Sequence, residues 1–176
     1  MRVIGGEFRS RRLKTIPGLA TRPTPDRLRE TLFDVLAARI SEAVFVDAYA
    51  GTGAVGIEAV SRGAARAIFL DRSRGALEIL RENIHQLGIE DRTQVVGGPV
   101  LVTLARQSGD IVFLDPPYEK EAEYSGALKL LAAAPPTLVI VQHSVRYEPG
   151  ETHGPLRRTR ILRQGDNILS FFSVPE

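Results

Sequence analysis

Four consecutive residues, Asp115, Pro116, Pro117 and Tyr118, combine side-chain and backbone groups that can act on an amine. They follow the apolar run Ile111–Leu114, which predicts that they leave the end of a buried strand. An exocyclic amine on a nucleobase is a poor nucleophile, because its lone pair is delocalised into the ring. The Asp115 carboxylate and the Pro116 carbonyl can each accept one of its N–H bonds and draw the nitrogen toward pyramidal geometry. The sequence therefore predicts a site that prepares an amine for methylation.

The other residues of this stretch suit the same task. Proline fixes φ and has no N–H, so the loop is stiff and offers mainly acceptors. Tyr118 offers a flat face on which a base can stack. The amine proton becomes acidic once the nitrogen is methylated, so positioning matters more than a strong base. A strand-ending turn accounts for the same residues, because an acid before prolines is common in turns. The methylation hypothesis therefore depends on what lies upstream.

A glycine-rich loop lies upstream and indicates a nucleoside cofactor. Gly51, Gly53 and Gly56 form a literal GxGxxG pattern, and Asp71 comes 20 residues after Gly51. Both features fit a dinucleotide fingerprint. However, Asp47 stands four residues before Gly51, where a carboxylate repels a pyrophosphate and attracts a cation. S-adenosylmethionine carries an ammonium and a sulfonium and no phosphate, so the spacing favours it over a dinucleotide.

Asp71 is expected to accept hydrogen bonds from the ribose hydroxyls of that cofactor. Packing in the core explains Tyr49 as readily as a place in the cofactor pocket does. The expected cofactor-binding residues are Asp47, Tyr49, Gly51, Gly53, Asp71 and Arg72.

Short apolar runs alternate with helical segments along most of the chain. Continuous apolar strands between helices are typical of a parallel sheet that is covered on both faces. If the first and fourth strands are neighbours, the glycines and Asp115 lie side by side at the switch point of the sheet. The expected strands are residues 43–46, 67–70, 94–96, 111–114 and 138–141, followed by a hairpin of residues 159–163 and 168–174. The expected helices are residues 53–61, 73–87, 99–105 and 123–133.

A further helix is expected to open at Thr24-Pro25-Asp26, with Thr24 as its N-cap and Pro25 in its first turn. Leu28 and Leu32 begin its apolar face. The residues before it, 1–20, read as a basic hairpin or arm. We therefore expect one globular protein, with an arm at 1–20 and a catalytic domain at 21–176.

Basic residues are concentrated near the N-terminus. Residues 1–29 hold eight basic and two acidic residues, a net charge of +6, whereas the rest of the chain carries −4. Such asymmetry indicates an anionic partner such as nucleic acid, although a solvated basic surface explains it equally well. The residues assigned to RNA binding are Arg2, Arg9, Arg11, Arg12, Lys14, Arg22 and Arg29.

The composition excludes several kinds of site and segment. The chain has 176 residues and no cysteine, so thiolate metal sites and disulfides are excluded. Its three histidines are too far apart in the sequence to suggest a ligand set, and we expect no metal. An apolar run of about 18 residues is missing, so no membrane helix is expected. We expect a monomeric, cytoplasmic protein.

Several segments resemble those of a known family. The motif at residues 115–118 is similar to that of methyltransferases acting on exocyclic amines. Residues 2–6 (RVIGG), 22–33 (RPTPDRLRETLF) and 58–64 (EAVSRGA) resemble the bacterial small-subunit (16S) ribosomal RNA guanine-N2 methyltransferases. The resemblance implies a class I methyltransferase with a mostly parallel, seven-stranded, Rossmann-like sheet and an N-terminal β-hairpin arm. It also implies S-adenosylmethionine as the methyl donor, a flipped guanine as the substrate, and ribosomal RNA or the small-subunit particle as the partner.

The chain departs from that family in a few places. Gly97-Gly98-Pro99 stand where relatives often carry a side chain that contacts the cofactor adenine, so backbone groups or apolar packing must serve instead. The role of Gln142 is left open. The charged residues that follow Tyr118, which are Glu119, Lys120, Glu121 and Glu123, are interpreted as a solvated loop over the site.

Three other functions remain open from the sequence. An adenine-N6 methyltransferase acting on DNA or RNA shares the motif at residues 115–118. The GxGxxG pattern alone also fits a nicotinamide-dependent oxidoreductase. The basic arm alone fits a non-catalytic RNA-binding protein.

Overall fold

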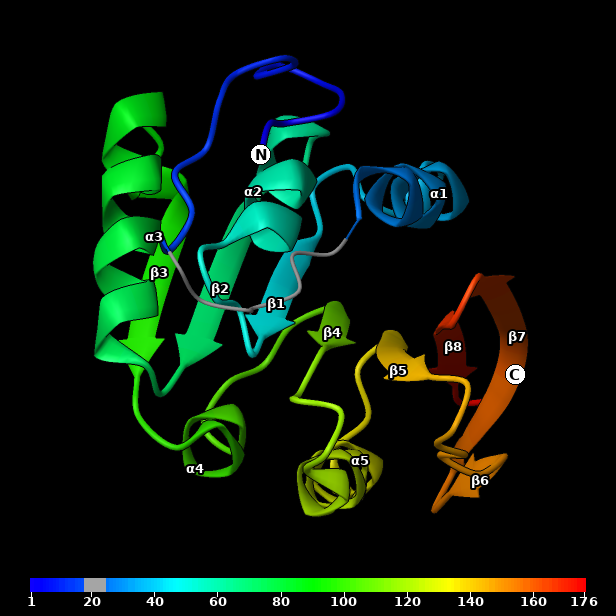
Figure 1. The fold of residues 1–176 in the computed structure, drawn as a ribbon. Helices are drawn as coiled ribbons and strands as arrows, with labels where there is room; N and C mark the ends of the chain where they lie inside the picture. The colour runs from blue at the N-terminus through cyan, green and yellow to red at the C-terminus, as the bar shows by residue number, and fades with distance from the viewer. Residues whose placement is uncertain (18–24) are drawn as a thin grey trace.

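The structure is a computed structural model that describes residues 1–17 and 25–176. Within these residues, one eight-stranded sheet lies between two layers of helices (Figure 1). The strand order is β3-β2-β1-β4-β5-β8-β7-β6. The strands are β1 (Val44–Ala48), β2 (Arg66–Asp71), β3 (Thr93–Gly97), β4 (Ile111–Leu114), β5 (Leu138–Ser144), β6 (Thr152–His153), β7 (Leu156–Gln164) and β8 (Asn167–Ser173). The helices are α1 (Asp26–Leu36), α2 (Ala54–Ser61), α3 (Arg74–Leu87), α4 (Val100–Leu104) and α5 (Glu121–Ala133), with a 3₁₀ turn at Glu90–Arg92.

The predicted fold class is confirmed. Strands β1 to β5 pair in parallel, β8 runs antiparallel to β5, and β7 forms the expected hairpin with β8. The eighth strand, β6, is a two-residue addition that pairs with β7 at the edge of the sheet. It was not predicted, because two polar residues between glycines carry no strand pattern.

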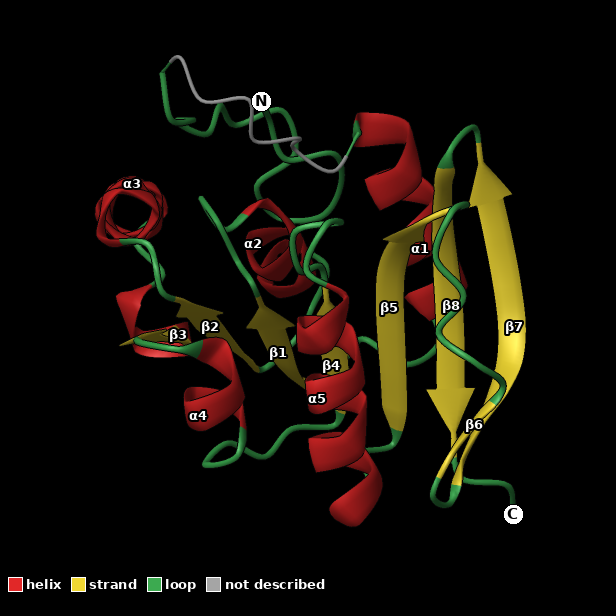
Figure 2. Ribbon diagram, turned by 60° about the horizontal axis from the view of Figure 1, so that its bottom comes forward, coloured by secondary structure: helices red, strands yellow, loops and turns green. Residues whose placement is uncertain are grey.

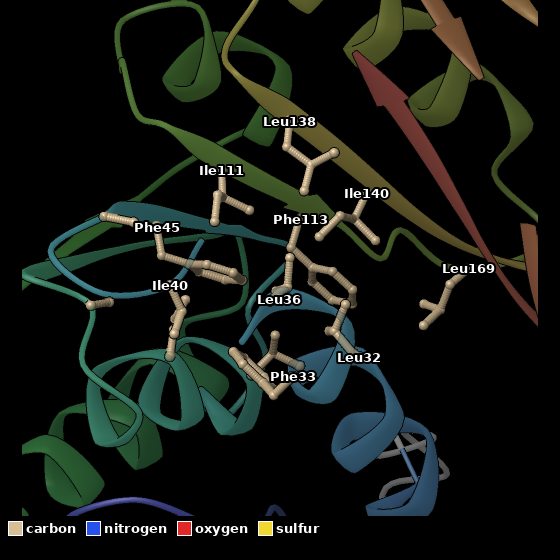
Figure 3. Close-up of a cluster of buried hydrophobic side chains, with 14 of the residues drawn as sticks. Leu32, Phe33, Leu36, Ile40, Phe45, Ile111, Phe113, Leu138, Ile140 and Leu169 are labelled. Atoms are coloured by element: carbon tan, nitrogen blue, oxygen red, sulfur yellow. The ribbon is translucent and has the colours of Figure 1, made fainter. Parts of the chain in front are cut away.

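Helices α1, α2 and α3 cover one face of the sheet, and α4 and α5 cover the other (Figure 2). Under α1, Leu32, Phe33 and Leu36 are fully buried against Phe45 of β1 and Phe113 of β4 (Figure 3). Burying a side chain of this size contributes about 1.5–3 kcal/mol. This cluster therefore fixes α1 on β1 and β4, the two strands that lead to Gly51 and to Asp115.

Residues 1–14 of the basic arm dock on α2 and α3. Val3, Phe8 and Leu13 are buried in one cluster with apolar residues of these helices. The expected β-hairpin is reduced to one antiparallel bridge between Arg2 and Arg12. Gly6 has φ +79°, and a Cβ there would lie 2.0 Å from the Ser61 carbonyl oxygen, so only glycine permits this close docking.

Helix α1 begins at Asp26, with Pro25 at the N-cap position. Thr24, the expected cap, and the domain boundary between residues 20 and 21 lie outside the described residues. In the part of the chain that the structure describes, no helix is both long enough and apolar enough to cross a membrane.

Candidate active site

The switch point of the sheet lies between β1 and β4. Strand β1 pairs with β2 on one side and β4 on the other, and the register sets Ala48 beside Leu114. The glycine loop (residues 49–53) and the acceptor loop (residues 115–118) therefore leave the sheet next to each other. A pocket of about 800 Å³ opens at this point. The predicted residues that line it are Asp47, Tyr49, Gly51, Asp71, Arg72, Asp115, Pro116, Pro117 and Tyr118.

Gly53 and Gly56 bring the start of α2 close to its neighbours. Gly53 has φ +91°, and a Cβ there would lie 2.2 Å from a Leu80 methyl carbon. A Cβ on Gly56 would lie 2.4 Å from the Phe69 ring. The Asp47 Oδ2 accepts the Gly56 N–H at 2.8 Å. Two of the three motif glycines thus serve close packing, which explains why the GxGxxG pattern by itself does not identify the cofactor.

Asp71 shapes the glycine loop from the end of β2. Its Oδ2 accepts the Gly51 N–H at 2.8 Å, and its Oδ1 accepts the Ser73 N–H at 2.8 Å. Each carboxylate oxygen keeps further acceptor capacity, which ribose hydroxyls can use. Beyond Asp71, Ala76 and Val100 line the pocket and give it an apolar wall.

Replacing Asp71 with alanine is expected to weaken S-adenosylmethionine binding by about 30-fold or more. The change removes the predicted acceptor for the ribose hydroxyls and the fixed partner of the Gly51 N–H, and hydrogen bonds to a charged group contribute about 1.5–3 kcal/mol each. Isothermal titration calorimetry measures the affinity. Asp91→Ala, an exposed acid on the 3₁₀ turn, serves as the control. An affinity within threefold of the wild type would contradict the role of Asp71.

Three carboxylates give the pocket its electrostatic character. Burial raises the pKa of Asp47 well above its usual value, and the nearby charges of Asp115 and Asp71 raise it further against the Gly56 hydrogen bond. Burial also raises the pKa of Asp115 to about 7. Like charges held this close favour a cationic ligand and oppose a phosphate.

The acceptor loop is tied to the C-terminal part of the sheet by two tyrosines. The Tyr118 hydroxyl donates to Asn167 Oδ1 at 2.6 Å, which joins the loop to the start of β8. The Tyr124 hydroxyl, fully buried in α5, lies 3.3 Å from the Pro116 carbonyl oxygen and 3.1 Å from that of Gln142. These contacts hold the Pro116 carbonyl and the Tyr118 ring in place before a substrate arrives.

The interpretation of residues 119–123 as a solvated loop was wrong for Glu121 and Glu123. Helix α5 begins at Glu121, and Glu123 Oε2 accepts a hydrogen bond from the Tyr49 hydroxyl at 2.6 Å. Burial and the Glu123 carboxylate both raise the pKa of Tyr49. Tyr49 lines the pocket and also packs against the buried cluster under α4 and α5. Its contact with a cofactor stays a prediction.

The basic residues assigned to RNA divide into three groups. Arg2, Arg9, Arg11, Arg12 and Lys14 are exposed on the arm. Arg22 lies outside the described residues. Arg29 does not fit the assignment, because its side chain is fully buried and its Nε lies 3.3 Å from the buried Glu58 carboxylate.

Residues 1–173 match the model of the family described as Conserved hypothetical protein 95. The chain belongs to this family. YlbH of Bacillus subtilis, assigned as an rRNA methyltransferase, is 34% identical over 169 residues, which are 91% of each chain. Ribosomal RNA small subunit methyltransferase D of Escherichia coli K12 is 39% identical over 122 residues, 68% of this chain and 61% of that relative. The match therefore spans about three fifths of the Escherichia coli relative.

Among solved structures, the Escherichia coli protein yhhF, assigned as a methyltransferase, is similar over nearly its whole length. The match covers 99% of this chain and 97% of the yhhF chain, with a TM-score of 0.85 and 32% sequence identity. Together with the family match, this likeness confirms the resemblance that the sequence motifs indicated.

Proposed function

We propose that the chain is an S-adenosylmethionine-dependent methyltransferase that modifies the exocyclic N2 amine of a guanine in small-subunit ribosomal RNA. The observation that carries the proposal is the meeting of two loops in one pocket. The glycine loop, which Asp47 and Asp71 flank, ends β1 and suits a cationic nucleoside, and the acceptor loop ends its neighbour β4. The names of the relatives support ribosomal RNA as the substrate.

The residues present fit this cofactor. Asp71 faces the place of a ribose, Ala76 and Val100 suit an adenine, and the buried carboxyl group of Asp47 holds the first turn of α2 through the Gly56 N–H. When bound, S-adenosylmethionine supplies a methyl group activated by its positive sulfur. The same three carboxylates oppose the pyrophosphate of a nicotinamide dinucleotide, and calorimetry with NADH tests that alternative.

The acceptor loop prepares the amine. Asp115 accepts one N–H of the guanine amine and the Pro116 carbonyl accepts the other, while Tyr118 stacks on the base. The freed lone pair of the nitrogen would form the new C–N bond as the methyl–sulfur bond breaks. The two electrons of the broken methyl–sulfur bond would stay on the sulfur. The methylated nitrogen then loses its proton to Asp115 or to water. Rigid placement of these groups supplies most of the rate enhancement.

The reaction is expected to depend on pH through Asp115. Its raised pKa, about 7, means that the group is largely protonated below neutrality, and a neutral carboxyl is a much weaker acceptor for the amine N–H than a carboxylate. The rate measured with both substrates below saturation should rise about tenfold per pH unit up to about pH 7, and then level off. Saturating S-adenosylmethionine should move the midpoint to lower pH, because its positive charge favours the ionised carboxylate.

The raised pKa of Asp115 also makes the stability of the folded protein depend on pH. A folded-state pKa above the unfolded value means that the folded protein holds the proton more tightly. The protein should therefore lose stability relative to Asp115→Asn as the pH rises from about 4 to 7. A rate that stays flat from pH 5.5 to 8 would contradict a perturbed Asp115.

Incubation with labelled S-adenosylmethionine and small-subunit RNA, followed by separation of the nucleosides, tests the proposed reaction. We expect the label in N2-methylguanosine. Label in N6-methyladenosine would favour the adenine alternative, and an unlabelled RNA would overturn the proposal. Running the assay on free RNA and on small-subunit particles identifies the form of the substrate.

A further inference from the structure

The end of the arm lies on the pocket. Met1, Thr15 and Ile16 line the pocket together with the glycine loop and with Ser73, which follows β2. From the sequence, RNA binding was the only role predicted for this arm. Its last described residues instead form a wall beside the place proposed for the cofactor.

A single buried side chain holds that wall in place. Asn83, fully buried in α3, accepts the Lys14 N–H at its Oδ1 at 2.7 Å. Its Nδ2 donates to the Lys14 carbonyl at 3.1 Å and to the Thr52 carbonyl at 3.0 Å. The amide thus uses its acceptor and both donors to bind the arm backbone and the glycine loop at once.

These hydrogen bonds fix the distance between the arm at Lys14 and the glycine loop at Thr52. A buried amide without partners costs free energy, so arm and loop cannot separate without exposing or orphaning Asn83. Every Lys14 atom that Asn83 contacts belongs to the backbone, whereas the Lys14 side chain points to solvent and pairs with Glu82 at 2.8 Å. Asn83 therefore acts on the path of the chain that leads to Thr15 and Ile16, and not on the charge of the arm.

We propose that Thr15 and Ile16 are part of the cofactor-binding site, and that Asn83 is the positioning residue that holds them against the glycine loop. The arm then has two roles, since its exposed arginines face RNA and its end encloses the cofactor. The inference rests on the proposed function, because it takes S-adenosylmethionine as the ligand of the pocket.

The test compares S-adenosylmethionine affinity by calorimetry in four full-length proteins: the wild type, Asn83→Ala, Ile16→Ala and Glu82→Ala. We expect at least tenfold weaker binding for Asn83→Ala and about threefold to tenfold weaker binding for Ile16→Ala. Glu82→Ala removes only the surface ion pair with Lys14 and leaves the hydrogen bonds of Asn83 intact. Its affinity for S-adenosylmethionine should therefore equal that of the wild type. In the methylation assay, the two weakened variants should raise KM for the cofactor and keep kcat, because neither residue touches the reacting atoms.

Loss of fold is separated from loss of binding by the choice of variants. Ile16→Ala leaves the hydrogen bonds of Asn83 intact and alters a partly exposed side chain. If Asn83→Ala does not fold, the affinity of Ile16→Ala therefore tests whether the end of the arm binds the cofactor. Wild-type affinity in Ile16→Ala and in folded Asn83→Ala would overturn the inference and leave the proposed function standing. A wild-type protein that binds no S-adenosylmethionine would overturn both.

Discussion

Asp115→Asn is expected to lower the rate of methyl transfer on the order of 10²–10³-fold while leaving cofactor and RNA affinity close to those of the wild type. Asparagine keeps the shape of the side chain but removes the negative charge and replaces one acceptor oxygen with a donor. The amine would then lack the charged acceptor that draws out its lone pair. Because the change acts on the reacting nitrogen, kcat should fall far more than either KM rises.

Single-turnover methylation with saturating S-adenosylmethionine measures this effect, and calorimetry checks that the cofactor still binds. Glu121→Gln is the matched control, since it removes an exposed acid from the first turn of α5, a few residues along the chain. The control should keep wild-type turnover. If Asp115→Asn retained more than a tenth of the wild-type rate, Asp115 would not be the acceptor for the amine.

Glu58→Ala is expected to reduce the free energy of unfolding by about 3–5 kcal/mol, because it removes the buried carboxylate beside the buried Arg29 and leaves that cation only the half-exposed Asp26, at 3.3 Å. Glu58 is fully buried in α2 and lies 3.3 Å from the buried Arg29 Nε. It also accepts the N–H groups of Ile4 and Gly5 at 2.8 and 2.9 Å and contacts Arg62 Nε at 2.8 Å. One carboxylate therefore compensates the charge of Arg29 in α1 and anchors the arm. Its loss should also expose the arm to proteolysis.

Urea unfolding and limited proteolysis measure the two effects. Asp34→Ala is the control, because Asp34 forms the outer pair with Arg62 at 3.8 Å and its side chain is 70% exposed. Exposed pairs contribute about 1 kcal/mol or less. A loss of less than 1 kcal/mol in Glu58→Ala would show that the arm and α1 do not depend on this carboxylate.

The sequence predicted the features that are encoded locally. Apolar runs alternating with helical segments predicted the parallel sheet, and the placement of Asp47 before Gly51 distinguished the glycine loop from a dinucleotide fingerprint. The acceptor loop was predicted because Asp115 and the two prolines stand at the end of an unmistakably apolar strand. Each of these signals lies within a few residues of the group it identifies.

Contacts between distant segments could not be predicted in this way. Glu123 is 74 residues from Tyr49, and Asn83 is 69 residues from Lys14. Neither acid nor amide differs in its local sequence from a solvated helix residue. Arg29 shows the converse error, since its charge indicated a surface contact, but Glu58 of another helix compensates its burial.

Mass spectrometry of small-subunit ribosomal RNA from a deletion strain tests the proposed function most directly. The strain should lack one N2-methylguanosine, the wild-type chain should restore it, and Asp115→Asn expressed at the same level should not. An unchanged N2-methylguanosine content in the deletion strain would contradict the assignment.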